Sequence, residues 1–203
     1  MTLRRTKSAE MNKEHWIEIR PVPKDPEILR PLVTEAEWET AAAMQSVSRR
    51  AEWLSWRAVA RERLGRETTI TYDTNGAPLL KEGRGWLSVS HTRGWVALVW
   101  SPRRCAVDME HASRDVSKVS ARFISETERE LDDAAGPLFP ISVWCAKEAL
   151  YKYTGVPGLD FMGDLRITAS DIAAGRMAGT VKGGEAVEIG LLFRDGLVIA
   201  AIF

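Results

Sequence analysis

The chain contains two apolar hairpins of the same kind, one at residues 86–100 and one at its end, residues 187–203. Each consists of two β-rich runs around a short polar turn. Each also follows a stretch with helical spacing, so both halves run from helix to antiparallel strands. The halves share few identical residues, and a duplication therefore rests on element order alone. The pattern predicts an α+β fold of two similar lobes, each a helix packed on a small antiparallel sheet, with the active site in the cleft between them.

The first lobe is expected at residues 15–102, after a polar segment, residues 1–14, that predicts a disordered tail. Its main helix should begin after an N-cap at Thr34 and end at Gly65, with a break near residues 45–48. Strands are expected at 15–20, 68–72, 86–90 and 95–101.

The second lobe is expected at residues 103–203. Its predicted helices cover 116–122, 126–135 and 141–154, and Ser125 with Glu128 forms a capping-box pattern at the second of them. Its predicted strands are 105–110, 165–168, 177–181, 187–193 and 197–203.

Composition excludes several classes of function. The 28 basic and 28 acidic side chains cancel, so no bulk charge favours nucleic acid or an anionic membrane as a partner. No apolar run reaches the roughly 18 residues of a membrane-spanning helix. Cys105 and Cys145 are far apart and lack metal-ligand spacing, and the chain opens on charged residues, which together predict a cytoplasmic protein.

Asp108 and Glu110 stand two residues apart on a predicted strand, so their carboxylates leave the same face and could hold one cation. Oxygen ligands alone suit Mg²⁺, or Mn²⁺. A bare D-x-E pair is better explained by two solvated acids on an exposed strand face. Glu148 is the third carboxylate that would complete a metal site.

Glu148 belongs to a helix face that also carries Trp144, Lys147, Tyr151 and Lys152. Taken alone, this face is better explained by an amphipathic helix with an ion pair between Glu148 and Lys152. The lysines could instead contact phosphates.

Ser90 and His91 follow a strand and are expected to open a turn, where a hydroxyl, backbone N–H groups and an imidazole can meet a phosphate. Arg49 and Arg57 lie about two helical turns apart and could clamp a terminal phosphate. A structural histidine and a solvated basic helix face remain the alternatives.

Taken together, five short motifs in the stretch from Arg49 to Lys152 resemble the 4'-phosphopantetheinyl transferases. They are R-x-x-E-W-L-x-x-R at 49–57, G-x-P at 76–78, S-x-S-H-T at 88–92, D-x-E at 108–110 and W-x-x-K-E-A-x-x-K at 144–152. The chain length and the two-lobed pattern are similar to the larger, pseudo-dimeric type, which binds coenzyme A and Mg²⁺ between its lobes.

The resemblance implies a role for each residue in these motifs. Asp108, Glu110 and Glu148 would hold Mg²⁺, and Asp108, Glu148 and Lys152 would serve catalysis. The contacts to coenzyme A would come from Arg49, Arg57, Gly76, Pro78, Ser90, His91, Lys147 and Lys152. Many relatives have a lysine just before the glycine of the G-x-P turn, where this chain has Asn75, so one phosphate contact is expected to be absent or supplied by Lys81.

The resemblance thus implies a monomeric, Mg²⁺-dependent transferase. It would move 4'-phosphopantetheine from coenzyme A to a serine of an apo acyl or peptidyl carrier protein and release adenosine 3',5'-bisphosphate. Two other readings use the same residues: a metal-dependent nucleotide or phosphate-ester hydrolase, and a relative that binds coenzyme A or a carrier protein without catalysis.

Overall fold

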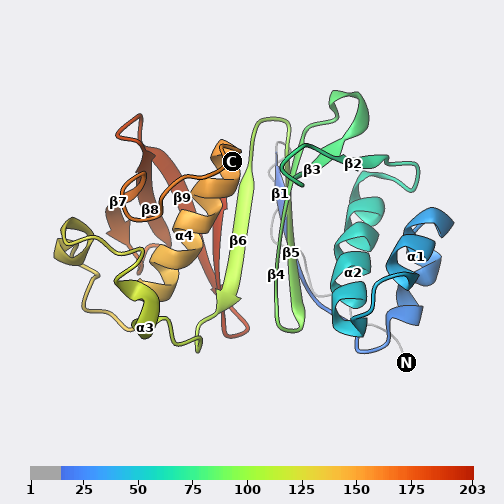
Figure 1. Cartoon of the computed structure of the whole chain (residues 1–203), viewed down its shortest axis with the longest axis horizontal. Coiled ribbons are helices and arrows are strands. Elements are labelled where there is room, and N and C mark those ends of the chain that lie inside the picture. Colours follow the sequence, from blue (N-terminus) through green and yellow to red (C-terminus); the bar gives the residue numbers. More distant parts are fainter. Residues whose placement is uncertain (1–14) are drawn as a thin grey trace.

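The computed structural model describes residues 15–203. These residues contain two five-stranded antiparallel sheets, each covered by one long helix (Figure 1). The tail predicted for residues 1–14 lies outside these residues. The strands of the first sheet are β1 (Trp16–Pro21), β2 (Ile70–Tyr72), β3 (Pro78–Leu80), β4 (Trp86–Thr92) and β5 (Trp95–Ser101). Those of the second are β6 (Ala106–His111), β7 (Leu165–Asp171), β8 (Arg176–Val181), β9 (Val187–Arg194) and β10 (Leu197–Ile202). The α-helices are α1 (Glu35–Ala42), α2 (Val47–Leu64), α3 (Ser117–Ser120) and α4 (Phe139–Thr154).

The two sheets have the same topology. The spatial order is β1-β5-β4-β3-β2 in the first and β6-β10-β9-β8-β7 in the second, so the first strand of each half pairs with its last. This order confirms the α+β fold with two similar lobes. The expected sequence of elements needs one correction, because each half begins with a strand and its helices come second.

The sheets pack face to face in the middle of the molecule, and α2 and α4 lie on the outer sides (Figure 1). Alternate residues of one strand therefore enter different cores. In β5, Val96 and Leu98 pack in the core with α2, whereas Ala97 and Val99 pack between the sheets against Met109. These layers bury β5 and β10 from both faces, which explains the nearly continuous apolar runs of these two strands, whereas β9 keeps one face exposed.

The predicted helices agree with the structure in one lobe and differ in the other. The main helix of the first lobe breaks where expected, between Ala42 and Val47. The helix predicted for 126–135 is only a 3-10 turn, Thr127–Glu130. The capping hydrogen bonds between Ser125 and Glu128 are present, but the Glu128 carboxylate also accepts from the backbone N–H of Ile167 in β7. A tertiary contact thus holds this segment in a short turn.

Glu37 anchors the N-terminal lobe. Its buried carboxylate accepts hydrogen bonds from Arg57 at 2.8 Å, from Arg61 at 2.7 and 2.9 Å, and from the Thr34 backbone N–H at 2.9 Å. Burial alone would raise the pKa of Glu37, but the hydrogen bonds from Arg61 and Thr34 and the charges of the two arginines lower it to about 2. The carboxylate therefore ties α1 to α2.

Lys147 forms the corresponding buried ion pair in the C-terminal lobe. Its fully buried ammonium donates to the carbonyl oxygens of Phe123 at 2.6 Å and Phe161 at 2.8 Å, and it forms an ion pair with Glu128 at 2.7 Å. The ammonium thus joins α4 to the two loops that flank it.

No helix in the described part of the chain combines the length and the apolar character that a membrane span requires.

We expect Glu37→Gln to destabilise the protein by about 3 kcal/mol near neutral pH, because two buried arginines lose their counter-ion. The folded-state pKa of Glu37, about 2, lies below its ordinary value of 4.5. The carboxylate therefore contributes its full stability above pH 4.5 and loses it as the pH falls toward 2. Denaturant unfolding of both proteins between pH 2 and 7 should show their difference shrinking over that window.

Glu35→Gln is the matched control, because Glu35 lies in the same helix and makes only an exposed ion pair with Arg30. Its effect should be about 0.5 kcal/mol or less. Equal effects of the two substitutions would contradict the role given to Glu37.

Candidate functional site

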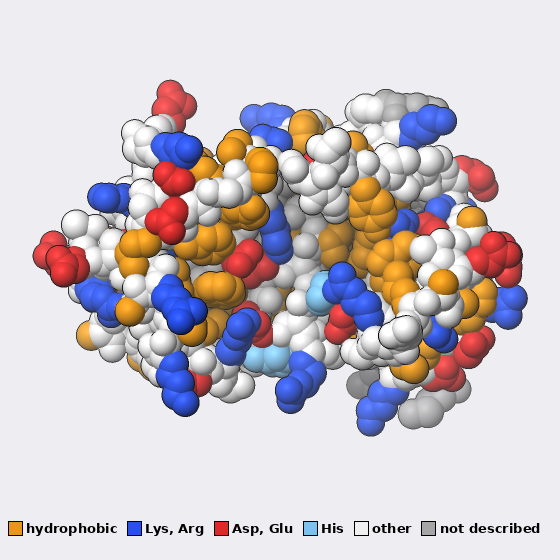
Figure 2. Space-filling model, in the orientation of Figure 1, with side chains coloured by type: hydrophobic (Ala, Val, Ile, Leu, Met, Phe, Trp, Pro, Cys, Tyr) orange, Lys and Arg blue, Asp and Glu red, His pale blue; other side chains and the backbone are white. Residues whose placement is uncertain are grey.

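A cavity of about 360 Å³ opens between the lobes, at the junction of β4, β6 and α4. Figure 2 shows acidic, basic and histidine side chains along the middle of the molecule, between the more apolar surfaces of the two halves. The cavity is lined by Val89, Ser90, His91, Asp108, Met109, Glu110, Arg114, Trp144, Glu148 and Lys152. The structure therefore brings together all three predicted metal ligands with Ser90, His91 and Lys152.

The backbone of β6 is held by side chains because β6 is an edge strand, hydrogen-bonded only to β10. Its outward N–H groups at Val107 and Met109 donate to the hydroxyls of Ser88 and Ser90, both at 3.1 Å. These hydroxyls lie on one face of β4, since they are two residues apart. Serines of the first lobe thus satisfy the open edge of the second.

Asp108 lies at the centre of this junction. Its Oδ1 accepts from Ser90 Oγ at 2.9 Å and from Lys152 Nζ at 2.7 Å. Lys152 also donates to the carbonyl oxygen of Val107 at 3.0 Å and, more weakly, to that of Val89 at 3.4 Å. The Lys152 ammonium therefore contacts β6 of its own lobe, β4 of the other lobe and the candidate metal ligand Asp108.

Glu110 is held by three donors. Its Oε1 accepts from Thr92 Oγ1 and from the His111 backbone N–H, and its Oε2 forms an ion pair with Arg114. Burial raises the pKa of Glu110, but these hydrogen bonds and the Arg114 charge together hold it below its ordinary value. Glu110 is consequently a fixed anion.

Glu148 differs from the other two acids, because it makes no hydrogen bond or ion pair with any residue that the structure describes. Burial raises its pKa, and the negative charge of Asp108 raises it further, against the charges of Lys152 and Arg114. Glu148 is therefore an insufficiently neutralised carboxylate beside another carboxylate.

The described residues contain no group of three or more His, Cys, Asp or Glu side chains already arranged to hold a metal ion. The donors nevertheless fit a hard divalent cation in chemistry, since all three are carboxylates. The raised pKa of Glu148 is further support, because the cavity holds three carboxylates and only two permanent cations, Arg114 and Lys152. A divalent cation would supply the missing positive charge.

His91 lies within β4 rather than in the turn predicted after it. Its Nε2 is 2.6 Å from Arg49 Nη1, and its Nδ1 is 3.3 Å from a carboxylate oxygen of Glu52. Burial lowers the pKa of His91, and the charges of Arg49 and Lys152 add to this against that of Glu52. Because arginine can only donate, Nε2 accepts and the proton resides on Nδ1. Arg49 and His91 thus form one pair at the rim of the cavity.

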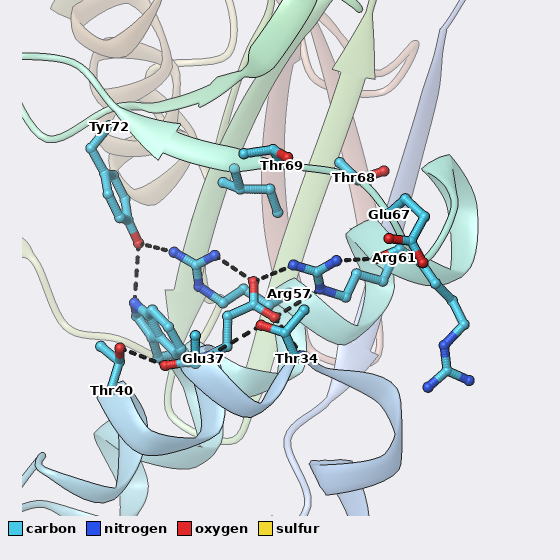
Figure 3. A pocket seen from close by; sticks show the side chains of 13 residues that line it. Thr34, Glu37, Thr40, Arg57, Arg61, Glu67, Thr68, Thr69 and Tyr72 are labelled. Carbon is cyan, nitrogen blue, oxygen red and sulfur yellow. Dashed lines mark hydrogen bonds and ion pairs between the residues drawn. The ribbon is translucent and has the colours of Figure 1, made fainter.

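Arg57 is not part of this pair, so the predicted clamp of Arg49 and Arg57 is not formed. The buried guanidinium of Arg57 donates to Glu37 and to the Tyr72 hydroxyl at 2.8 Å. It lies 3.8 Å from the centroid of the Trp53 ring. Figure 3 shows it lining a second cavity, of about 520 Å³, between α1, α2 and β2.

Three other predicted contact residues also lie outside the interlobe cavity. Lys147 is buried in the ion pair with Glu128 and cannot reach a phosphate in the cleft. Gly76 lies in the turn between β2 and β3 with a φ of 80°, and Pro78 is the first residue of β3. Beside them, Asn75 donates from Nδ2 to the carbonyl oxygen of Gly155 at 3.1 Å, which fastens this turn to the C-terminal lobe.

Two residues of the site carry roles that sequence reasoning did not assign. Thr92 donates a hydrogen bond to Glu110. The sequence indicates this position, because Thr92 continues the alternation of hydroxyl side chains at Ser88 and Ser90 along β4. Arg114 pairs with Glu110 from a loop, where the i,i+4 spacing of helices gives no information.

Comparison with known proteins agrees with this site. A search of curated proteins found no match for the chain. Residues 104–196, which include β6, α4 and all three acids of the cavity, match the family described as the 4'-phosphopantetheinyl transferase superfamily. The chain is therefore similar to this superfamily over the segment that contains the candidate metal ligands.

Proposed function

We propose that the protein transfers 4'-phosphopantetheine from coenzyme A to a serine hydroxyl of an apo carrier protein. The observation that carries the proposal is the grouping of Asp108, Glu110, Glu148 and Lys152 in one interlobe cavity, within the matched superfamily domain. Carboxylates in excess would repel a pyrophosphate, so a divalent cation, Mg²⁺ or Mn²⁺, has to accompany it. Both halves of the cavity come from one chain, which supports a monomer as the working unit.

The residues divide the chemistry among them. Glu148 makes no hydrogen bond or ion pair with a described residue, so it is proposed to accept the proton of the attacking serine. The serine oxygen forms a bond to the β-phosphorus of coenzyme A, and the bond to adenosine 3',5'-bisphosphate breaks. Lys152, already anchored by two backbone carbonyls, stabilises the negative charge on the transferred phosphoryl group.

A metal ion held by Asp108, Glu110 and Glu148 would add Lewis-acid stabilisation of the pyrophosphate when bound. Arg49 and His91, paired at the rim, are proposed to receive the 3'-phosphate of coenzyme A, and Ser90 to lie beside them. We also propose a cytoplasmic location, because both cysteines are free thiols buried in the two cores.

We expect Asp108→Asn and Glu148→Gln each to lower the rate of transfer by at least about 100-fold, because each removes a charge from the reacting centre. The melting temperature of Glu148→Gln should change little, since Glu148 has no hydrogen-bond or ion-pair partner among the described residues. Asp108→Asn should also lower the melting temperature, because Lys152 loses its buried counter-ion. The measurement is intact mass of an apo carrier protein incubated with coenzyme A and Mg²⁺.

Glu188→Gln, an exposed change on β9, is the control and should transfer normally. Near-normal transfer by either active-site variant would contradict the assignment. Consumption of coenzyme A by the wild type without a mass change in any carrier would instead favour a hydrolase.

We expect Arg49→Gln to weaken coenzyme A binding about tenfold while leaving 3'-dephospho-coenzyme A binding unchanged, because a charged hydrogen bond to the 3'-phosphate is lost. Arg57→Gln should instead lower the melting temperature and keep the preference for the 3'-phosphate. Calorimetric titration of the two ligands separates these effects. Loss of the preference only in the Arg57 variant would restore the predicted role of that residue and remove that of Arg49.

A further inference from the structure

The loop after β6 places a permanent cation on a candidate metal ligand. Arg114 Nη1 contacts Glu110 Oε2, whereas the donors to Oε1 are Thr92 and the backbone N–H of His111. The other face of the Arg114 guanidinium lies over Trp144, with 5.6 Å between Cζ and the ring centroid. Arg114 is therefore positioned from two sides inside the cavity lining.

A divalent cation and Arg114 would compete for the same oxygen of Glu110. Thr92 and the backbone of His111 fix one oxygen of Glu110 permanently, so Oε2 is the oxygen left for a ligand, and Arg114 is its described partner. A divalent cation that binds Glu110 through Oε2 must compete with the guanidinium. The Arg114 side chain is 48% exposed, whereas that of Glu110 is 14% exposed, so the arginine is the partner that can move into solvent.

We propose, resting on the function proposed above, that Arg114 is the resident counter-ion of Glu110 and is displaced when the divalent cation binds. Metal binding at this site is then an exchange of one cation for another. The released guanidinium remains beside the cavity, where a pyrophosphate that arrives with the metal ion can accept its hydrogen bonds. Arg114 is thus a positioning residue that links occupancy by metal to occupancy by coenzyme A.

The first test is titration of the whole protein with MnCl₂ alone, followed by the electron paramagnetic resonance signal of free Mn²⁺. We expect Arg114→Gln to bind Mn²⁺ about 2- to 5-fold more tightly than the wild type, since a half-exposed ion pair no longer competes. A residue that only supported the packing of Trp144 would have no such effect or would weaken binding.

Arg122→Gln is the matched control, because it removes the same charge from an exposed position outside the cavity lining. A double-mutant cycle with Glu110→Gln isolates the pair: in that background Arg114→Gln should change Mn²⁺ affinity no more than Arg122→Gln does. Binding by Arg114→Gln that is no tighter than by the Arg122 control would overturn the exchange.

The second test repeats the Mn²⁺ titration with saturating coenzyme A and no carrier protein. Coenzyme A should tighten Mn²⁺ binding by a larger factor in the wild type than in Arg114→Gln, because only the wild type transfers the guanidinium from Glu110 to the pyrophosphate. Equal factors in the two proteins would refute the transfer of the guanidinium. The titration with Mn²⁺ alone needs neither coenzyme A nor turnover. It can therefore show the cation exchange in a protein that does not transfer 4'-phosphopantetheine, and an active transferase can equally show no exchange.

Discussion

The open edge of β6 is the constraint on which the junction of the lobes depends. A strand that pairs on one side only leaves N–H and C=O groups that must be satisfied elsewhere. Here the hydroxyls of Ser88 and Ser90 satisfy two N–H groups, and Lys152 satisfies the Val107 carbonyl. The same contacts fix Asp108. The candidate site and the contact between the lobes therefore share one hydrogen-bond network.

Each lobe also contains a buried ion pair that resembles a functional site in sequence. Arg57 and Lys147 belong to motifs with a plausible phosphate-binding role, yet their charges are neutralised by Glu37 and Glu128. Both acids lie far from their partners in sequence. No local spacing could reveal that these cations serve the fold, because the deciding contact is long-range.

Features that depend on local spacing could be predicted from the sequence, whereas features that depend on long-range contacts could not. The alternation of Asp108 and Glu110 along a strand and the placement of Glu148 and Lys152 on one helix face follow from backbone periodicity, and the structure brings these four residues together. The two-lobed α+β fold followed from the repeated hairpins. The helix predicted for 126–135 was wrong because Glu128 bonds to Ile167 in β7, and Arg114 was missed because a loop has no period.

The shared topology of the two sheets gives Asp108 a counterpart in the first lobe. Asp108 faces Ala200, the fourth residue of β10, and Glu18 faces Leu98, the fourth residue of β5. Glu18 pairs with Arg63 near the end of α2, as Asp108 pairs with Lys152 near the end of α4. The next outward residue of β1, however, is Arg20, which closes the position with ion pairs to Glu18 and Glu62. The same topological position is thus an open acidic cavity in the second lobe and a closed cluster of ion pairs in the first, so two sheets of equal topology present opposite surfaces at their equivalent edges.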